Sequence, residues 1–170
     1  MRMRLSAFAS AALLGAVLLG TALEGYAEER KLDLKKIADK IISTVNGGDP
    51  VAVTNLYTQD AVMIQSNEPG PVRGHAAILK SYQGSFRAFP DMRVEFPSIM
   101  FSEDTIISEG VCHGTFTGPM ATPDGEVAPT GKSFKFRMVF LAKISPDGLI
   151  AEDRSYFDNL DFMKQLGLIK

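Results

Sequence analysis

Cysteine and histidine are scarce in this sequence. Its 170 residues include one cysteine, Cys112, and two histidines, His75 and His113. A single cysteine excludes a disulfide within the chain. Because Cys112 and His113 are neighbours on a predicted strand, their side chains point to opposite faces and cannot share a metal ion or form a catalytic dyad. The sequence therefore predicts neither a zinc site nor a metal cofactor.

The chain also lacks an excess of charge of either sign. Its 18 basic and 20 acidic residues give a formal net charge of −2, and the basic residues form no cluster. Nucleic-acid binding is therefore not expected, because it needs a concentrated basic surface. Hydrophobic residues make up 45% of the chain, which is enough for one domain with its own core.

The first 27 residues have the pattern of a secretory signal peptide. Two arginines precede an apolar run at 7–20, and small residues precede a cleavage point after Ala27. The run is short for a membrane span, so no stable membrane insertion is expected after cleavage; an uncleaved anchor is the alternative. Cleavage would leave a single domain, 28–170, with a formal charge of −3, in the periplasm or secreted.

Helical patterns come first along this domain. Apolar residues at intervals of three and four predict an amphipathic helix over 32–45, which Asn46-Gly-Gly48 ends. Asp49-Pro50 is typical of a helix start, and the second helix is expected to run to about Tyr57. A third helix is predicted over 75–89.

Strand patterns follow the helices. A short strand at 61–65 precedes the third helix, and the later strands are expected at 92–96, 99–101, 105–117, 133–144 and 149–157. Helices first and strands afterwards predict an α+β fold, with helices covering one face of a curved antiparallel sheet.

Several short motifs, in order, resemble one family. They are Arg73-Gly-His75, Phe89-Pro-Asp91, Gly110-Val-Cys-His-Gly-Thr-Phe-Thr-Gly118, Pro129-Thr-Gly-Lys132, Asp147-Gly148, Tyr156-Phe-Asp158 and Gln165-Leu-Gly167. From about Leu32 to Leu168 the chain resembles the nuclear transport factor 2-like superfamily, and within it the SnoaL-like polyketide cyclases.

The resemblance implies a cone-shaped fold in which the curved sheet wraps a cavity capped by the N-terminal helices. It also implies a cofactor-free ring closure of the ester cyclase or aldol type, with Asp158 at the position of the family's catalytic acid and base. Arg154 stands where the family often has tryptophan, and Gly110-Val-Cys112 replaces its usual Gly-Thr pair, so an aromatic polyketide substrate is not assured.

The last hairpin places the candidate chemical groups. Strand alternation puts Glu152, Arg154, Tyr156 and Asp158 on one face, and Asp153, Ser155 and Phe157 on the other. A two-residue turn would set Asp158 opposite Arg137 and depress its pKa. A four-residue loop would set Arg137 opposite Tyr156 instead, whereas a three-residue loop would set Asp158 against Phe136 and raise its pKa.

The predicted catalytic residues are Asp158, His113 and Tyr156, with Asp158 moving the proton and the other two hydrogen-bonding a substrate oxygen. For Asp158 the alternative is a cap on a closing helical turn at 159–166, and for His113 and Tyr156 it is a packed structural role. The predicted ligand-binding residues are Arg137, Arg154, Met138, Phe136, Phe86, Phe89 and Met63.

Three functions fit these patterns. The first is a cofactor-free cyclase or isomerase acting on a small hydrophobic molecule. The second is a carrier that binds such a molecule in the cell envelope without turnover, and the third is an interaction module that dimerises through the sheet. An export signal weighs against a polyketide cyclase, because polyketide assembly is cytoplasmic, whereas an exported hydrolase, isomerase or binding protein is easier to explain. A homodimer is expected in each case.

Overall fold

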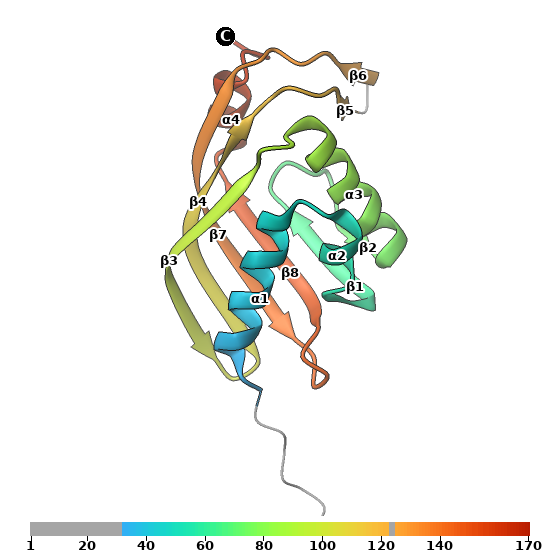
Figure 1. The fold of residues 1–170 in the computed structure, drawn as a ribbon, viewed down its shortest axis with the longest axis vertical. Coiled ribbons are helices and arrows are strands. Elements are labelled where there is room, and N and C mark those ends of the chain that lie inside the picture. The colour runs from blue at the N-terminus through green and yellow to red at the C-terminus, as the bar shows by residue number, and fades with distance from the viewer. Residues whose placement is uncertain (1–31, 123–124) are drawn as a thin grey trace, which may run out of the picture. The chain divides into compact units, whose positions relative to one another are not determined.

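The computed structural model describes residues 32–122 and 125–170 (Figure 1). The predicted signal peptide at 1–27 lies outside the described residues. None of the helices within the described ranges is long and apolar enough to cross a membrane.

Three helices cover one face of a bent six-stranded sheet, which confirms the α+β prediction (Figure 1). The helices are α1 (Leu34–Gly47), α2 (Pro50–Thr54) and α3 (His75–Ala88). The strands lie in the order β2-β1-β8-β7-β4-β3. Their bounds are Tyr57–Gln65 for β1, Val72–Arg73 for β2, Arg93–Ser102 for β3, Thr105–Thr115 for β4, Ser133–Ile144 for β7 and Ile150–Phe157 for β8.

The sheet is mixed rather than wholly antiparallel, because β1 and β8 run parallel. The other neighbouring pairs are antiparallel. Most of the domain separates β1 from β8 in sequence, so no hairpin turn forces them to run in opposite directions. The segment between β4 and β7, for which the sequence pattern predicts no strand, contains two short paired strands, β5 (Met120–Thr122) and β6 (Gly125–Val127), and the short helix α4 (Asn159–Gln165) follows β8.

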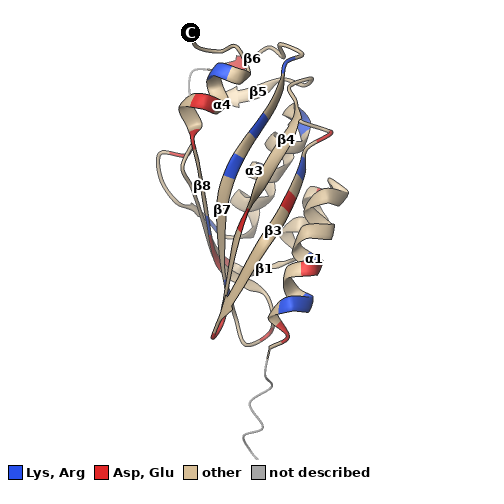
Figure 2. Cartoon of the chain, turned by 90° about the vertical axis from the view of Figure 1, so that its left-hand side faces the viewer, with Lys and Arg blue, Asp and Glu red and all other residues tan. Residues whose placement is uncertain are grey.

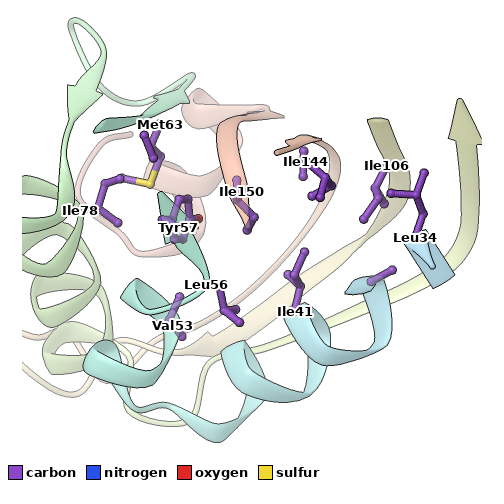
Figure 3. Packing of buried hydrophobic residues seen from close by; sticks show 13 residues of the cluster. Leu34, Ile41, Val53, Leu56, Tyr57, Met63, Ile78, Ile106, Ile144 and Ile150 are labelled. Carbon is purple, nitrogen blue, oxygen red and sulfur yellow. The ribbon is translucent and has the colours of Figure 1, made fainter. Parts of the chain in front are cut away.

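Helix α1 packs its apolar stripe onto the sheet. Leu34, Ala38 and Ile41 are buried, and Ile37 and Val45 pack at the edge of the same cluster. Figure 3 shows Leu34 and Ile41 among isoleucines of β4, β7 and β8. Asp33 caps the first turn by accepting from the Lys36 amide, and Gly48 ends the helix in the left-handed conformation.

Two glycines of the motif at 110–118 allow close approaches of the backbone. A Cβ atom at Gly110 would overlap the carbonyl of Glu95, where β3 bulges against β4. A Cβ atom at Gly118 would overlap the carbonyl of Arg87 at the end of α3. These two glycines are therefore explained by packing. Without side chains, Gly110 allows β3 to lie close to β4, and Gly118 allows the end of α3 to lie close to the chain that follows β4.

A β-bulge in β8 decides which side chains enter the core. Ser145 donates its amide to the Leu149 carbonyl at 2.7 Å, which leaves a three-residue loop between them. Ile144 then pairs with Ile150, but Lys143 pairs with Glu152, so Ala151 is the extra residue. Past the bulge, Asp153 and Ser155 point inward and are 1% and 7% exposed.

The side chain of Asn46 links the end of α1 to the edge strand β3 by two hydrogen bonds. Its side chain accepts from the Val94 amide at 2.8 Å and donates to the Val94 carbonyl at 3.0 Å. Because β3 is an edge strand, these two backbone groups have no neighbouring strand to pair with.

We expect Asn46→Ala to lower the free energy of unfolding by about 1–3 kcal/mol, because it removes both partners of the Val94 peptide groups. Urea unfolding measures the change. Asn55→Ala is the matched control, since Asn55 is exposed and its substitution should change stability by less than about 0.5 kcal/mol. Equal losses in the two variants would contradict this role for Asn46.

Candidate functional site

A cavity of about 490 Å³ lies between the helices and the inner face of the sheet. Its lining comes from α1 and α3 on one side and from β1, β4, β7 and β8 on the other. Most of this lining is apolar, and phenylalanine is its commonest residue: Phe89, Phe96, Phe134, Phe136, Phe140, Phe157 and Phe162. A cavity of this size and character suits a small, largely apolar molecule.

The aromatic side of the cavity is held by ring-to-ring packing. Phe136 stacks on Phe157 with ring centroids 4.4 Å apart, and Phe162 of α4 meets both rings edge-on. Phe134 stacks on the other side of Phe136 at 5.5 Å. These contacts join β7, β8 and α4 into one wall, so the shape of this side is set before a ligand enters.

The opposite side carries a buried polar network of two tyrosines and an aspartate. Tyr57 of β1 donates its hydroxyl hydrogen bond to Asp153 Oδ2 of β8. The Tyr57 hydroxyl oxygen lies 2.9 Å from that of Tyr82 in α3. Both tyrosines line the cavity, and Asp153 lies behind them. Its second oxygen, Oδ1, is buried and has no hydrogen-bond partner among residues 32–122 and 125–170.

Burial shifts the ionisation of all three groups toward the neutral form. It raises the pKa of Asp153 to about 7; the Tyr57 hydrogen bond opposes this rise and the charge of Glu152 adds to it. Burial also raises the pKa of both Tyr57 and Tyr82, and the nearby Asp153 carboxyl adds to each rise. Near neutral pH the tyrosines are therefore phenols, while Asp153 divides between its two forms. A group of this kind can both accept and return a proton.

Comparison with known proteins identifies the family. The sequence profile described as SnoaL-like polyketide cyclase matches residues 35–166. The chain belongs to this family. The resemblance found in the sequence motifs is thus confirmed, and it extends over nearly all of the described SnoaL-like domain. Comparison with curated protein sequences gives no match.

Solved structures share the fold. IdmH from Streptomyces antibioticus is 25% identical, with a TM-score of 0.64 over 80% of this chain and 99% of IdmH. AclR from Streptomyces galilaeus is 23% identical, with a TM-score of 0.66 over 80% and 96%. A protein with a ketosteroid isomerase-like fold from Catenulispora acidiphila, solved with trimethylamine, is 17% identical, with a TM-score of 0.65 over 78% and 92%.

The structure brings three of the predicted ligand-binding residues of the SnoaL-like domain to the cavity. Phe89, Phe136 and Met138 all line it. Two others do not line the cavity. The ring of Phe86 in α3 lies 5.8 Å from that of Tyr82, and Met63 of β1 is buried in the hydrophobic core under the helices.

The remaining predicted site residues lie away from the cavity. Along β4, β7 and β8 the side chains of His113, Arg137, Arg154 and Tyr156 alternate with cavity-lining residues and therefore face outward. Charged residues recur along these outer positions of β7 and along β3 (Figure 2). His113 Nε2 lies 3.5 Å from Glu95 Oε1, and Arg154 pairs with Glu152 at 2.7 Å. Their roles in binding or catalysis stay predictions.

Asp158 is exposed and caps α4. Its Oδ1 accepts from the Asp161 amide at 2.9 Å, which is the capping role set out as the alternative for this residue. The strand ladder has the register of a two-residue turn but ends one residue earlier, with Phe157 opposite Met138, so Asp158 forms no strand pair with Arg137 or Phe136. A catalytic role for Asp158 also stays a prediction, and the cavity offers Asp153 in its place.

Cys112 lines the cavity with its thiol, while His113 faces outward, as strand alternation predicts. Burial raises the pKa of Cys112 to about 12, so the thiolate needed of a nucleophile is not formed near neutral pH. Across residues 32–122 and 125–170, no group of three or more His, Cys, Asp or Glu side chains could hold a metal ion.

Proposed function

We propose that this SnoaL-like protein catalyses a cofactor-free proton transfer, an isomerisation or a ring closure, on a small apolar carbonyl compound. The observation that carries the proposal is a buried carboxyl, Asp153, linked through the hydroxyls of Tyr57 and Tyr82 to a mostly apolar cavity. Family membership supports this class of reaction. The network supplies an acid and base beside a mostly apolar cavity.

The forward step moves a proton from carbon to Asp153. The substrate carbonyl lies in the cavity with its neighbouring C–H bond at the Tyr82 hydroxyl. As that bond breaks, its electron pair moves toward the carbonyl oxygen and forms an enolate. The proton passes to the Tyr82 oxygen, the Tyr82 proton passes to Tyr57, and the Tyr57 proton passes to the Asp153 carboxylate.

The return step runs along the same hydrogen bonds. Neutral Asp153 gives its proton to Tyr57, Tyr57 gives its own to Tyr82, and Tyr82 gives its own to the substrate. Delivery to a different carbon completes an isomerisation. Delivery to the alkoxide, formed when the enolate carbon attacks a second carbonyl, completes a ring closure. Neither route consumes water, an oxidant or a metal ion.

We expect Tyr82→Phe to slow the reaction by about 100-fold, because the hydroxyl in contact with the substrate is lost. The measurement is exchange of the protons beside the carbonyl of 2-tetralone in heavy water, followed by proton NMR. Tyr156→Phe is the matched control, since Tyr156 is 46% exposed on the outer face of the sheet. It should exchange at the wild-type rate.

Two outcomes would contradict the proposal. If the wild-type protein binds 2-tetralone but does not accelerate exchange, the cavity serves a carrier and not an enzyme. If Tyr156→Phe slows exchange and Tyr82→Phe does not, the chemistry lies on the outer face. Folding of each variant is checked by its melting temperature, so that lost activity is not confused with lost structure.

We also propose, from the pattern of residues 1–27 alone, that the protein works in the periplasm or outside the cell. From the resemblance to the family, whose members commonly dimerise through the sheet, we propose that it is a homodimer. Mass spectrometry of the protein recovered from the extracellular or periplasmic fraction should show Glu28 as its first residue. A chain that stays in the cytoplasm and keeps Met1 would contradict the proposed location. Light scattering of the purified protein gives the oligomeric state, and a monomer would contradict the dimer.

A further inference from the structure

A second polar group lies on the cavity wall, separate from the tyrosines. Gln65 of β1 and Ser155 of β8 are directly paired across the two strands, and both line the cavity. Ser155 is 7% exposed. Within the described part of the chain, neither the Ser155 hydroxyl nor the Gln65 amide forms a side-chain hydrogen bond, whereas the neighbouring Ser66 hydroxyl bonds the Phe157 carbonyl at 3.1 Å.

The surroundings of Ser155 are apolar. It pairs across the sheet with Phe140 on one side and precedes Phe157 by one inward position. Ser155 is buried and Gln65 beside it is half-buried. A buried hydroxyl loses free energy unless something hydrogen-bonds it. Both groups open onto the cavity, so a bound molecule can supply the missing partner.

Gln65 and Ser155 lie one inward position further along β1 and β8 than Met63 and Asp153. Ser155 is two residues beyond Asp153 on the same face of β8, which separates their Cα atoms by roughly 6.5 Å. Gln65 likewise follows Met63, the β1 partner of Asp153, by two residues. Two polar points therefore lie along the β1–β8 side of the cavity, and the Ser155 point lies beside Phe157 of the aromatic wall.

We infer that Gln65 and Ser155 recognise a second oxygen substituent of the substrate, at the far end of a flat apolar body from the reacting carbonyl. The inference rests on the proposed function for the position of that carbonyl. A hydroxyl or a second carbonyl suits the pair, because serine and glutamine can each donate and accept a hydrogen bond. The apolar body between the two oxygens packs on the phenylalanine rings.

The test compares two ligands of nearly equal size, 6-hydroxy-2-tetralone and 6-methyl-2-tetralone. Dissociation constants for both are measured by calorimetry with the wild type, Ser155→Ala, Gln65→Leu and the double variant. The wild type should prefer the hydroxyl compound, and the double variant should reduce the preference about tenfold. Comparing ratios between variants cancels the different hydration of the two ligands.

Ser108→Ala is the matched control. Ser108 is a buried serine of β4, 2% exposed, that does not line the cavity, so its loss should leave the ratio unchanged. A ratio that is the same in all variants would overturn the inference, and so would a wild type that binds neither ligand. A change equal in Ser108→Ala and Ser155→Ala would also overturn it.

Binding and turnover separate the two proposals. If the ratio of dissociation constants changes as expected but neither ligand exchanges protons, the proton-transfer function fails while the recognition of a second oxygen stands. If exchange occurs and the ratio is insensitive to Gln65 and Ser155, the function stands and the inference fails.

Discussion

Asp153→Asn should slow proton exchange of 2-tetralone by about 100-fold or more, while Asp158→Asn should leave the rate near that of the wild type. An amide at position 153 keeps the size of the side chain but cannot take up the proton that the two tyrosines deliver. At position 158 an asparagine still caps α4, since asparagine caps helices as well as aspartate does. The two substitutions are chemically identical and differ only in where the carboxyl lies.

This pair of variants decides between the aspartate that the sequence motif indicates and the aspartate that the cavity indicates. Loss of exchange in Asp158→Asn, with normal exchange in Asp153→Asn, would contradict the account and return the catalytic role to Asp158. Binding of 2-tetralone by Asp153→Asn, measured separately, shows whether the cavity is intact. The expected result is unchanged binding with lost exchange.

The second large effect is on stability and depends on pH. Asp153 has a folded-state pKa of about 7, whereas an aspartate in an unfolded chain has one of about 3.9. Below about pH 4 both states hold the proton, and the group does not affect stability. Between about pH 4 and pH 7 only the unfolded state ionises, so stability falls as the pH rises; above about pH 7 the loss is complete.

The loss is on the order of 4 kcal/mol, given that each pKa unit corresponds to about 1.36 kcal/mol. An asparagine at position 153 cannot ionise, so Asp153→Asn should not show this loss of stability. Urea unfolding of the wild type and Asp153→Asn, from about pH 4 to about pH 8, measures the difference in free energy between them. Because both proteins share every other titrating group, the difference reports Asp153 alone. We expect the free energy of unfolding of Asp153→Asn to increase relative to that of the wild type as the pH rises. A difference in unfolding free energy that does not change with pH would contradict the raised pKa of a buried Asp153.

The sequence predicted the fold well because its signals are local. The stripe of α1, the glycine stop after it and the alternation of the later strands all involve residues within a few positions of one another. What it missed depends on distant pairing. The parallel contact of β1 with β8, the start of β1 at Tyr57 and the small β5–β6 hairpin have no such local pattern.

The candidate site was harder to predict for a related reason. Alternation correctly grouped Asp153, Ser155 and Phe157 on one face, but it does not say which face of β8 turns inward. The resemblance to the family placed the catalytic acid at Asp158, which favoured the opposite face. Its partner Tyr57 lies 96 positions away and was expected at the end of a helix. The presence of Phe157 on the same face was the one signal in the sequence that pointed inward.

The bulge at Ala151 shows why the register could not be obtained from loop length alone. The hairpin begins as one with a three-residue loop, and the extra residue then restores the register expected of a two-residue turn. Without the bulge, the inward face beyond Ile150 would carry Glu152 and Arg154 in place of Asp153 and Ser155. One unpaired residue thus determines which polar side chains of β8 turn inward, Asp153 behind the tyrosines and Ser155 at the cavity.

The measurement that tests the central claim most directly is the pH dependence of 2-tetralone exchange by the wild-type protein. If ionised Asp153 accepts the proton through Tyr57 and Tyr82, kcat/KM should rise with a single midpoint near pH 7 and level off above it. Asp153→Asn should show no such rise. A rate that is independent of pH between about pH 5 and pH 9, or a midpoint near 7 that persists in Asp153→Asn, would contradict the claim that this buried carboxyl is the catalytic acid and base.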